Sequence, residues 1–156
     1  MDLLVDVRTV PRSRMNQQFN SDVLSKALAA GDIGYRHFPA LGGLRHRPKG
    51  APPLPNGLWR NEAFQAYADY AMTPPFRAAL GELHGLGQDH VCAIMCAEAV
   101  WWRCHRRIVA DYLLTDGTEV RHIMAAGKID PASLTPGAEP RADSSIVYPP
   151  AQGMLI

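Results

Sequence analysis

The sequence contains few cysteines and no long apolar run. Its 156 residues include only three cysteines, Cys92, Cys96 and Cys104, and this small, odd set fits a reducing cytoplasm better than a disulfide-bonded scaffold. No apolar stretch approaches the length of about eighteen residues that a membrane span needs. The N-terminus lacks the basic start and the apolar stretch of a signal peptide. We therefore expect a cytoplasmic protein without a membrane partner.

Motifs of two common site classes are also missing. No C-x2-C or H-x3-H pair anchors a zinc site, so we predict no metal site, and the sequence specifies no cofactor. A zinc site built from separated residues is the minority alternative, with ligands drawn from Cys96, Cys104, His105, His37 and His122. A standard phosphatase loop needs an arginine six residues after its cysteine. Trp102 stands at that place after Cys96, which excludes that class.

Positive charge is concentrated in the N-terminal part of the sequence. Residues 1–60 hold nine lysines and arginines against four acids, whereas residues 61–156 hold seven against eleven. A basic face of this kind attracts an anionic substrate or a nucleic acid. No basic tract is long enough to indicate nucleic-acid binding by itself, so a set of solvated loop residues is the alternative.

Predicted strands alternate with predicted helices. Short apolar, β-branched runs predict strands at 3–7, 33–38, 90–96 and 119–124. Capping residues and apolar periodicity predict helices at 21–30, 61–71 and 73–86, and a fourth helix that ends near Leu114. This order is typical of an α/β fold, here a single Rossmann-like domain with a small, mostly parallel sheet flanked by helices. The run at 90–96 is apolar on both faces, which predicts a central strand. We assign 1–125 to this domain and 126–156 to an irregular tail, with an added edge strand near 144–148.

Three separated groups of candidate residues follow the predicted strands. In an α/β sheet, ligands bind beyond the carboxyl ends of the strands, where these groups are expected to meet. Asp6 is an acid inside an apolar strand, which costs free energy unless it is paired, and Arg8 or Arg106 is the expected partner. The groups are Asp6 and Arg8 after the first strand, His37, Gly42 and Gly43 after the second, and Cys96 and Glu98 after 90–96.

The stretch CAEAVWWRCHRR, residues 96–107, crowds two cysteines, a glutamate, a histidine and three arginines together. If the next helix begins near Trp101, its free N–H groups and its dipole lower the pKa of Cys104 and favour a nucleophile. If the helix begins near Glu98, Cys104 falls on an apolar stripe and belongs to the core. Both interpretations stay open.

The neighbours of Cys104 allow similar pairs of interpretations. Cys96 is either a reactive thiol at a strand end or a buried structural cysteine. Glu98 and His105 are either proton-transfer groups or ordinary surface residues. Of Trp101 and Trp102, at most one is expected to face a flat ligand, and the other is expected to lie in the core.

Four separated segments carry a resemblance to a known family. They are DVRTVPRSRMNQQFN (6–20), YRHFPALGG (35–43), CAEAVWWRCHR (96–106) and VRHI (120–123). With them the chain resembles the domain-of-unknown-function 488 family, which implies a small Rossmann-like α/β domain without an assigned reaction. It also favours the late helix start, because relatives tend to carry Asp-Pro where this chain has Ala99-Val100. The implied pocket residues are Asp6, Arg8, Pro11, Ser13, Tyr35, His37, Gly42, Gly43, Cys96, Glu98, Cys104, His105, Arg106 and His122.

Members of that family usually begin with one more strand and a helix before the strand that carries Asp6. This chain begins at the latter strand. We therefore expect a truncated or alternative start, a replacement strand near Ile146, or exchange of a strand within a homodimer.

The sequence thus predicts an enzyme-like domain that binds a small anionic or nucleotide-like ligand. Cys96 or Cys104 is the expected nucleophile and Glu98 or His105 the expected proton-transfer group of a transferase or hydrolase. The alternatives are a non-catalytic nucleic-acid or regulatory binding module, and a fragment that is stable only as an oligomer. The expected ligand-binding residues are Asp6, Arg8, Ser13, Tyr35, His37, Gly42, Gly43, Arg106 and His122.

Overall fold

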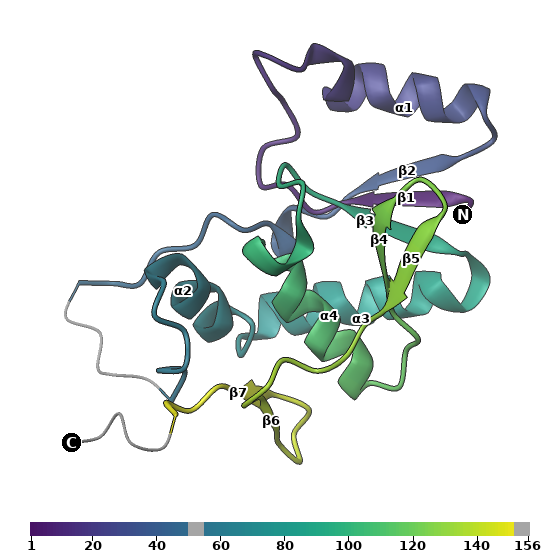
Figure 1. Cartoon of the computed structure of the whole chain (residues 1–156). Helices are drawn as coiled ribbons and strands as arrows, with labels where there is room; N and C mark the ends of the chain where they lie inside the picture. Colours follow the sequence, from purple (N-terminus) through teal and green to yellow (C-terminus); the bar gives the residue numbers. More distant parts are fainter. Residues whose placement is uncertain (50–54, 152–156) are drawn as a thin grey trace.

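A small parallel sheet organises the chain, as Figure 1 shows. The computed structural model describes residues 1–49 and 55–151. The sheet contains three strands in the order β2-β1-β3, all parallel. They are β1 (Leu3–Asp6), β2 (Gly34–His37) and β3 (Cys92–Met95).

Helices lie on both faces of this sheet. They are α1 (Ser21–Ala30), α2 (Glu62–Tyr70), α3 (Pro74–Asp89) and α4 (Arg106–Thr115), with short 3-10 turns η1 (Gln17–Phe19), η2 (Pro39–Leu41) and η3 (Trp101–Arg103). In Figure 1, α1 lies on one side of the sheet, and α3 and α4 lie on the other. The Asn61 side chain caps α2 by accepting from the N–H groups of Ala63 and Phe64, and Pro74 opens α3. These are the start signals that the sequence contains.

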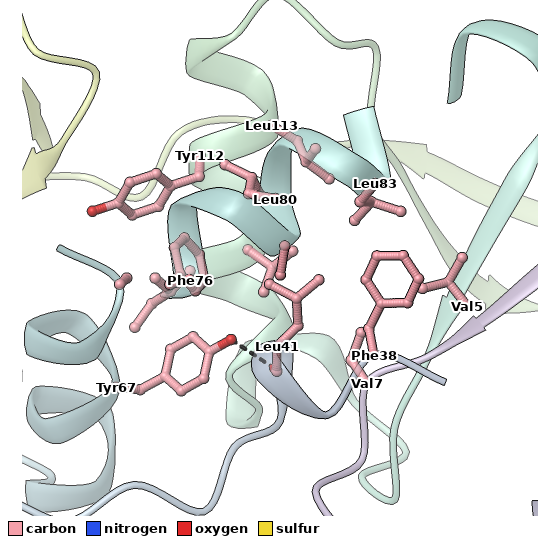
Figure 2. Packing of buried hydrophobic residues seen from close by; sticks show 14 of the residues in the cluster. Val5, Val7, Phe38, Leu41, Tyr67, Phe76, Leu80, Leu83, Tyr112 and Leu113 are labelled. Atoms are coloured by element: carbon pink, nitrogen blue, oxygen red, sulfur yellow. Dashed lines mark hydrogen bonds between the residues drawn. The ribbon is translucent and has the colours of Figure 1, made fainter. Parts of the chain in front are cut away.

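The hydrophobic core lies between the sheet and the helices α2, α3 and α4. Val5 of β1 and Val7, which follows β1, point into it and are fully buried, as are Phe76 of α3 and Ile108 of α4. Figure 2 shows Phe38 and Leu41, which follow β2, packed against the same cluster. Each large apolar side chain buried in this way contributes about 1.5–3 kcal/mol. All ten residues of α1 are exposed or half-buried, so the opposite face of the sheet is covered less closely.

Two antiparallel pairs follow α4. They are β4 (Arg121–Ala125) with β5 (Lys128–Pro131), and β6 (Glu139–Pro140) with β7 (Ile146–Val147). The strand expected at 119–124 therefore forms, but it pairs with β5 instead of extending the parallel sheet. A strand also forms within 144–148, and its partner is β6 instead of a sheet edge. The result is a mixed α/β structure with one parallel sheet of three strands.

β3 is an edge strand of the described sheet, so the prediction that 90–96 is the central strand is wrong. β1 occupies the centre. All four β3 side chains are half-buried, because Ile94 packs against the core and the free edge of β3 faces a cavity next to β4. A cavity next to β4, instead of a further strand, therefore lies beside the apolar run at 90–96. None of the helices in the described part of the chain is long and apolar enough to cross a membrane.

Candidate functional site

A cavity of about 410 Å³ opens where the three parallel strands end. The loops that follow β1, β2 and β3 form much of its wall, and α2 contributes Phe64 and Tyr67. The structure thus brings segments that are far apart in the sequence to one place, at the carboxyl edge of the sheet. The predicted site residues that line this cavity are Arg8, Ser13, Gly43, Cys96, Glu98, Cys104 and His105.

Cys96 and Cys104 face each other in the wall of the cavity. Their Sγ atoms are 2.8 Å apart, so the thiol of one donates to the sulfur of the other. Cys96 follows β3 and is half-buried, whereas only 3% of the surface of Cys104 is exposed. The backbone N–H of Glu98 donates to Cys96 Sγ over 3.2 Å. The two cysteines therefore form one hydrogen-bonded pair.

Further polar atoms converge on the sulfur of Cys104. The helix α4 begins at Arg106, so the start near Glu98 is wrong and the thiol lies just before the first free N–H groups of the helix. The backbone N–H of Arg106 lies 3.4 Å from Cys104 Sγ, and its Nε lies 3.3 Å away. Nδ1 of His105 lies 3.5 Å from the same sulfur. This environment suits a thiolate better than a thiol.

Three contacts fix the imidazole of His105. Its Nε2 lies 3.1 Å from the carbonyl oxygen of Val7, and because a carbonyl only accepts, Nε2 carries a proton. The ring of Tyr67 packs against it with centroids 5.0 Å apart. Gly43 lies so close that a Cβ at this position would overlap Nδ1. Nδ1 is thus directed at Cys104, as an acceptor when the imidazole is neutral and as a donor when it is charged.

The two cysteines differ in their affinity for a proton. The hydrogen bond from Cys96 lowers the pKa of Cys104, and His105 and the Arg106 backbone add to this effect against the opposing effect of burial. The same hydrogen bond, together with burial, raises the pKa of Cys96. Such a pair titrates as a unit. The surroundings therefore favour the proton on Cys96 and the negative charge on Cys104.

Asp6 and Arg8 form a buried ion pair at the edge of the cavity. Arg8 donates to both carboxylate oxygens, with Nε 2.9 Å from Oδ1 and Nη2 2.6 Å from Oδ2. The hydroxyl of Tyr35 donates to Oδ2 over 2.6 Å. Burial acts to raise the pKa of Asp6, but the hydrogen bonds from Arg8 and Tyr35 outweigh it and lower that pKa. Burial, together with the hydrogen bond to Asp6, raises the pKa of Tyr35 to about 12. Arg8, and not Arg106, is therefore the partner of Asp6.

His37 and Gly42 hold the backbone around the cavity and do not line it. Nε2 of His37 lies 2.6 Å from the carbonyl oxygen of Arg8, which fixes the loop after β1. A Cβ on Gly42 would overlap the side chain and the backbone of Thr9. The Thr9 hydroxyl also accepts from the N–H of Leu44 over 3.1 Å. The glycine pair therefore lets the loops after β1 and β2 pack directly on each other.

Ser13 and Pro11 belong to the loop that connects β1 with α1. The N–H of Ser13 donates to Oδ1 of Asn20 over 2.7 Å, which explains why Asn20 does not cap α1 with its side chain. The carbonyl of Pro11 accepts from the N–H of Ser21 over 3.1 Å. Of the two, only Ser13 reaches the cavity.

Glu98 contributes its backbone to the site. Its carbonyl oxygen accepts from Nη2 of Arg106 over 2.6 Å, and its N–H supports Cys96. The carboxylate is exposed at the rim of the cavity. Proton transfer was one of the two roles predicted for Glu98. His105 is the better placed residue for that role, because its ring contacts the sulfur of Cys104.

His122 does not join this cavity. Its ring stacks on Trp101, with centroids 3.8 Å apart and planes parallel, and both line a second cavity of about 560 Å³ beside β3. Burial, with the nearby Arg106, lowers the pKa of His122. Arg106 also lines this second cavity. Trp101 is half-buried and Trp102 is 42% exposed. Neither tryptophan lies in the core, so the expectation that one of them does is wrong.

The described residues do not assemble a metal site. Among 1–49 and 55–151, no group of three or more His, Cys, Asp and Glu side chains could hold a metal ion. Two members of the alternative zinc set are engaged elsewhere, because His37 is bonded to the Arg8 carbonyl and His122 stacks on Trp101.

Several residues of the site were not among the predicted site residues. Arg12 and Arg103 are exposed and line the cavity. Tyr67 contacts His105 from α2, and its hydroxyl donates to the carbonyl of Leu41 over 2.7 Å. Val7 acts through its carbonyl oxygen, which any residue possesses. Only the two arginines had a sequence signal, the basic excess of the N-terminal part and of the stretch 96–107.

A family model described as "Domain of unknown function DUF488" matches residues 1–113. The match covers more than half of the chain, so the protein belongs to this family, and the predicted family resemblance is confirmed. The segment 120–123 lies outside the matched residues. Searches of curated proteins and of solved structures found no match. The family description names no reaction.

Proposed function

We propose that this protein is a cysteine-dependent enzyme in which the thiolate of Cys104 attacks a small anionic ligand bound in the 410 Å³ cavity. The observation that carries the proposal is the set of polar atoms around Cys104 Sγ, namely Cys96 Sγ at 2.8 Å, Arg106 Nε at 3.3 Å and His105 Nδ1 at 3.5 Å. A thiolate, and not a thiol, is the nucleophile in cysteine chemistry.

The reaction class is group transfer through a covalent intermediate. Cys104 Sγ forms a bond to an electrophilic carbon of the ligand, and the bond to the leaving group breaks with its electron pair. The charged imidazole of His105 gives the proton on Nδ1 to that leaving group. An acceptor then attacks the same carbon, gives its proton back to Nδ1 and releases the thiolate. Water as the acceptor makes the enzyme a hydrolase, and another hydroxyl or amine makes it a transferase.

Charge around the cavity supports an anionic ligand. Arg12 and Arg103 line the cavity and are exposed, whereas the charge of Arg8 is neutralised by Asp6. The carboxylate of Glu98 is the opposing charge at the rim. Free guanidinium groups bind carboxylates and phosphates through paired hydrogen bonds. The parallel β2-β1-β3 order with helices on both faces supports a Rossmann-like arrangement. Folds of this kind bind their ligands at the carboxyl edge of the sheet, where the cavity lies.

The test compares an anionic and a neutral alkylating agent of similar size. Reduced full-length protein is treated with iodoacetate or iodoacetamide between about pH 5.5 and 9, and labelling of each cysteine is followed by peptide mass spectrometry. We expect Cys104 to react at a rate nearly independent of pH, because its thiolate is already formed. Cys92 is the internal control, since burial raises its pKa and its rate should rise about tenfold per pH unit.

Arginine variants test the preference of the cavity for an anion separately from the reactivity of the Cys104 thiolate. Arg12→Gln and Arg103→Gln should each lower the preference for iodoacetate roughly threefold, the factor for a unit charge about 7 Å away in water. Arg14→Gln is the matched control, because Arg14 is exposed in the same loop and is not among the cavity residues. A Cys104 that stays unreactive until unfolding would contradict the proposal and favour the non-catalytic binding module. Equal rates for both agents would contradict the anionic ligand.

A further inference from the structure

The pair of sulfurs in the cavity has a second chemistry. We propose that Cys96 and Cys104 close a reversible disulfide when a hydroperoxide reaches the cavity, and that this bond switches off the nucleophile. The inference deepens the proposed function, because it concerns the same Cys104 thiolate. It rests on the separation of 2.8 Å between the two sulfurs and on the chain segments that carry them.

The geometry favours bond formation within one chain. A disulfide needs its sulfurs at about 2.05 Å, so the atoms must approach each other by less than 1 Å. Cys96 lies at the end of β3 and Cys104 just before α4, with the exposed residues 97–99 in the connecting loop. That loop absorbs the small movement more easily than a strand or a helix. Cys92 lies at the start of β3, where its Sγ is 4.0 Å from the carbonyl oxygen of His90.

The electron and proton balance closes with a hydroperoxide as the oxidant. The Cys104 thiolate attacks one oxygen of the O–O bond, the other oxygen leaves with the electron pair and takes a proton, and Cys104 becomes a sulfenic acid. Cys96 then attacks this sulfur, the S–S bond forms and the S–O bond breaks. The thiol proton of Cys96 leaves with the oxygen as water. Two sulfurs lose one electron each, and the peroxide is reduced by two.

The roles of the two cysteines follow from their surroundings. Cys104 is the peroxide-reactive sulfur because Arg106 and His105 stabilise its thiolate. Cys96 keeps the proton and is the resolving thiol. A reducing dithiol attacks the Cys96 sulfur, because that residue is half-buried while Cys104 is only 3% exposed. Cys104 then leaves as a stabilised thiolate, which accelerates the exchange.

The disulfide removes the features on which the proposed reaction depends. Cys104 Sγ loses its negative charge, so it no longer attacks a carbon and no longer pairs with the His105 imidazolium. Peroxide should therefore abolish the rapid iodoacetate labelling of Cys104, and a dithiol should restore it. Cys92 should keep its labelling rate throughout.

The experiment uses reduced full-length protein and about one equivalent of hydrogen peroxide. Intact mass is measured before and after, and peptides are mapped without reduction. We expect a loss of about 2 Da and a linked pair of peptides that contain Cys96 and Cys104. Dithiothreitol should return the original mass. Cys92→Ser is the matched control and should behave as the wild type.

Two further variants assign the roles. Cys96→Ser should stop at the sulfenic acid, which dimedone traps, and should then proceed to a gain of about 32 Da on Cys104. Cys104→Ser should form no disulfide. A wild-type protein that gains about 32 Da on Cys104 without a linked peptide would overturn the proposal, and so would a disulfide that contains Cys92 or joins two chains.

Failure of this switch is distinguishable from failure of the enzyme proposal. Rapid, pH-independent alkylation of Cys104 without a disulfide would remove the switch and leave the nucleophile. A disulfide with equal rates for iodoacetate and iodoacetamide would keep the redox pair and remove the anionic ligand.

Discussion

Gly43 determines where the imidazole of His105 can lie. Its Cα stands against the ring, and any Cβ would overlap Nδ1, the atom directed at Cys104. We predicted Gly43 to be a ligand-binding residue because its loop follows a predicted strand and because the family resemblance implied it. The structure shows that the absence of a side chain at Gly43 allows close packing against a histidine 62 positions away in the sequence. A single sequence contains no record of such a contact.

Replacement of Gly43 by alanine should therefore act on chemistry more than on stability. The new methyl group displaces the ring of His105, Nδ1 leaves Cys104 Sγ, and the thiolate loses one stabilising contact. We expect the pKa of Cys104 to rise by about one unit for a loss of about 1.4 kcal/mol, so the pH below which its alkylation slows should lie about one unit higher.

Gly85→Ala provides the matched control for this variant. Nothing lies within 4 Å of a Cβ at Gly85 in α3, and alanine favours a helix by up to about 1 kcal/mol. It should leave the labelling rate unchanged. Unaltered reactivity of Gly43→Ala would show that His105 does not support the thiolate.

At the scale of elements, β1 serves both the core and the site. Val5 and Val7 point into the core, while Asp6 between them binds Arg8 on the other face. The alternation of a strand makes this division possible, and the sequence indicated it, because an acid in an apolar strand requires a partner. The sequence could not show that β1 is central, since the run at 90–96 is the more apolar of the two, although β3 lies at the sheet edge beside a cavity.

The ion pair gives the protein a defined acid sensitivity. The folded-state pKa of Asp6 lies below the unfolded value of about 3.9. Its contribution is therefore fully present above about pH 4 and is lost as the pH falls through the folded value. Asp6→Asn should cost about 3–5 kcal/mol at neutral pH, because it leaves Arg8 buried without its counter-charge.

Urea unfolding at several pH values measures this effect. The loss caused by Asp6→Asn should shrink as the pH falls from about 4 through the folded-state pKa of Asp6, because the wild type is then also protonated. The double variant Asp6→Asn with Arg8→Met should lose less than the sum of the single losses, because the two side chains interact. A loss that is independent of pH would contradict the ion pair as its cause.

At the scale of the whole molecule, the segment after β5 is fastened to α4 by polar contacts. The hydroxyl of Tyr148 donates to Oδ2 of Asp111 over 2.8 Å, and the N–H of Thr135 donates to Oδ1 over 2.9 Å. The N–H of Tyr148 also donates to the side chain of Asn56 over 2.9 Å. The segment's many prolines and glycines gave no periodicity from which this attachment could be predicted. Partners so far apart in sequence are found only in the folded chain.

Tyr148→Phe should destabilise the protein more at neutral pH than in acid. Burial raises the pKa of Asp111 above its unfolded value, in spite of its hydrogen bonds, so stability declines as the pH rises through the folded-state value. Removal of the hydroxyl leaves the ionised carboxylate with one donor fewer, which costs about 1.5–3 kcal/mol, but only about 0.5–1.5 kcal/mol when the acid is neutral.

Tyr70→Phe is the comparison for this prediction. Its hydroxyl donates to a neutral acceptor, the carbonyl of Ala40, over 2.7 Å, so its loss should be similar at every pH. Both losses are read from urea unfolding between about pH 4 and 7. Parallel losses in the two variants would show that Asp111 is not the acid responsible.

The hydrogen bond between Val7 and His105 joins residues that are 98 positions apart. The imidazole is therefore oriented only after the two ends of the family-matched region have come together, and until then Cys104 is an ordinary thiol with a pKa of about 8.5. This reverses the usual logic of thiol labelling, in which modification marks molecules that have opened. In mildly acidic solution the chains that are labelled fast are the folded ones. The fraction of Cys104 that is labelled fast therefore measures the native population during refolding.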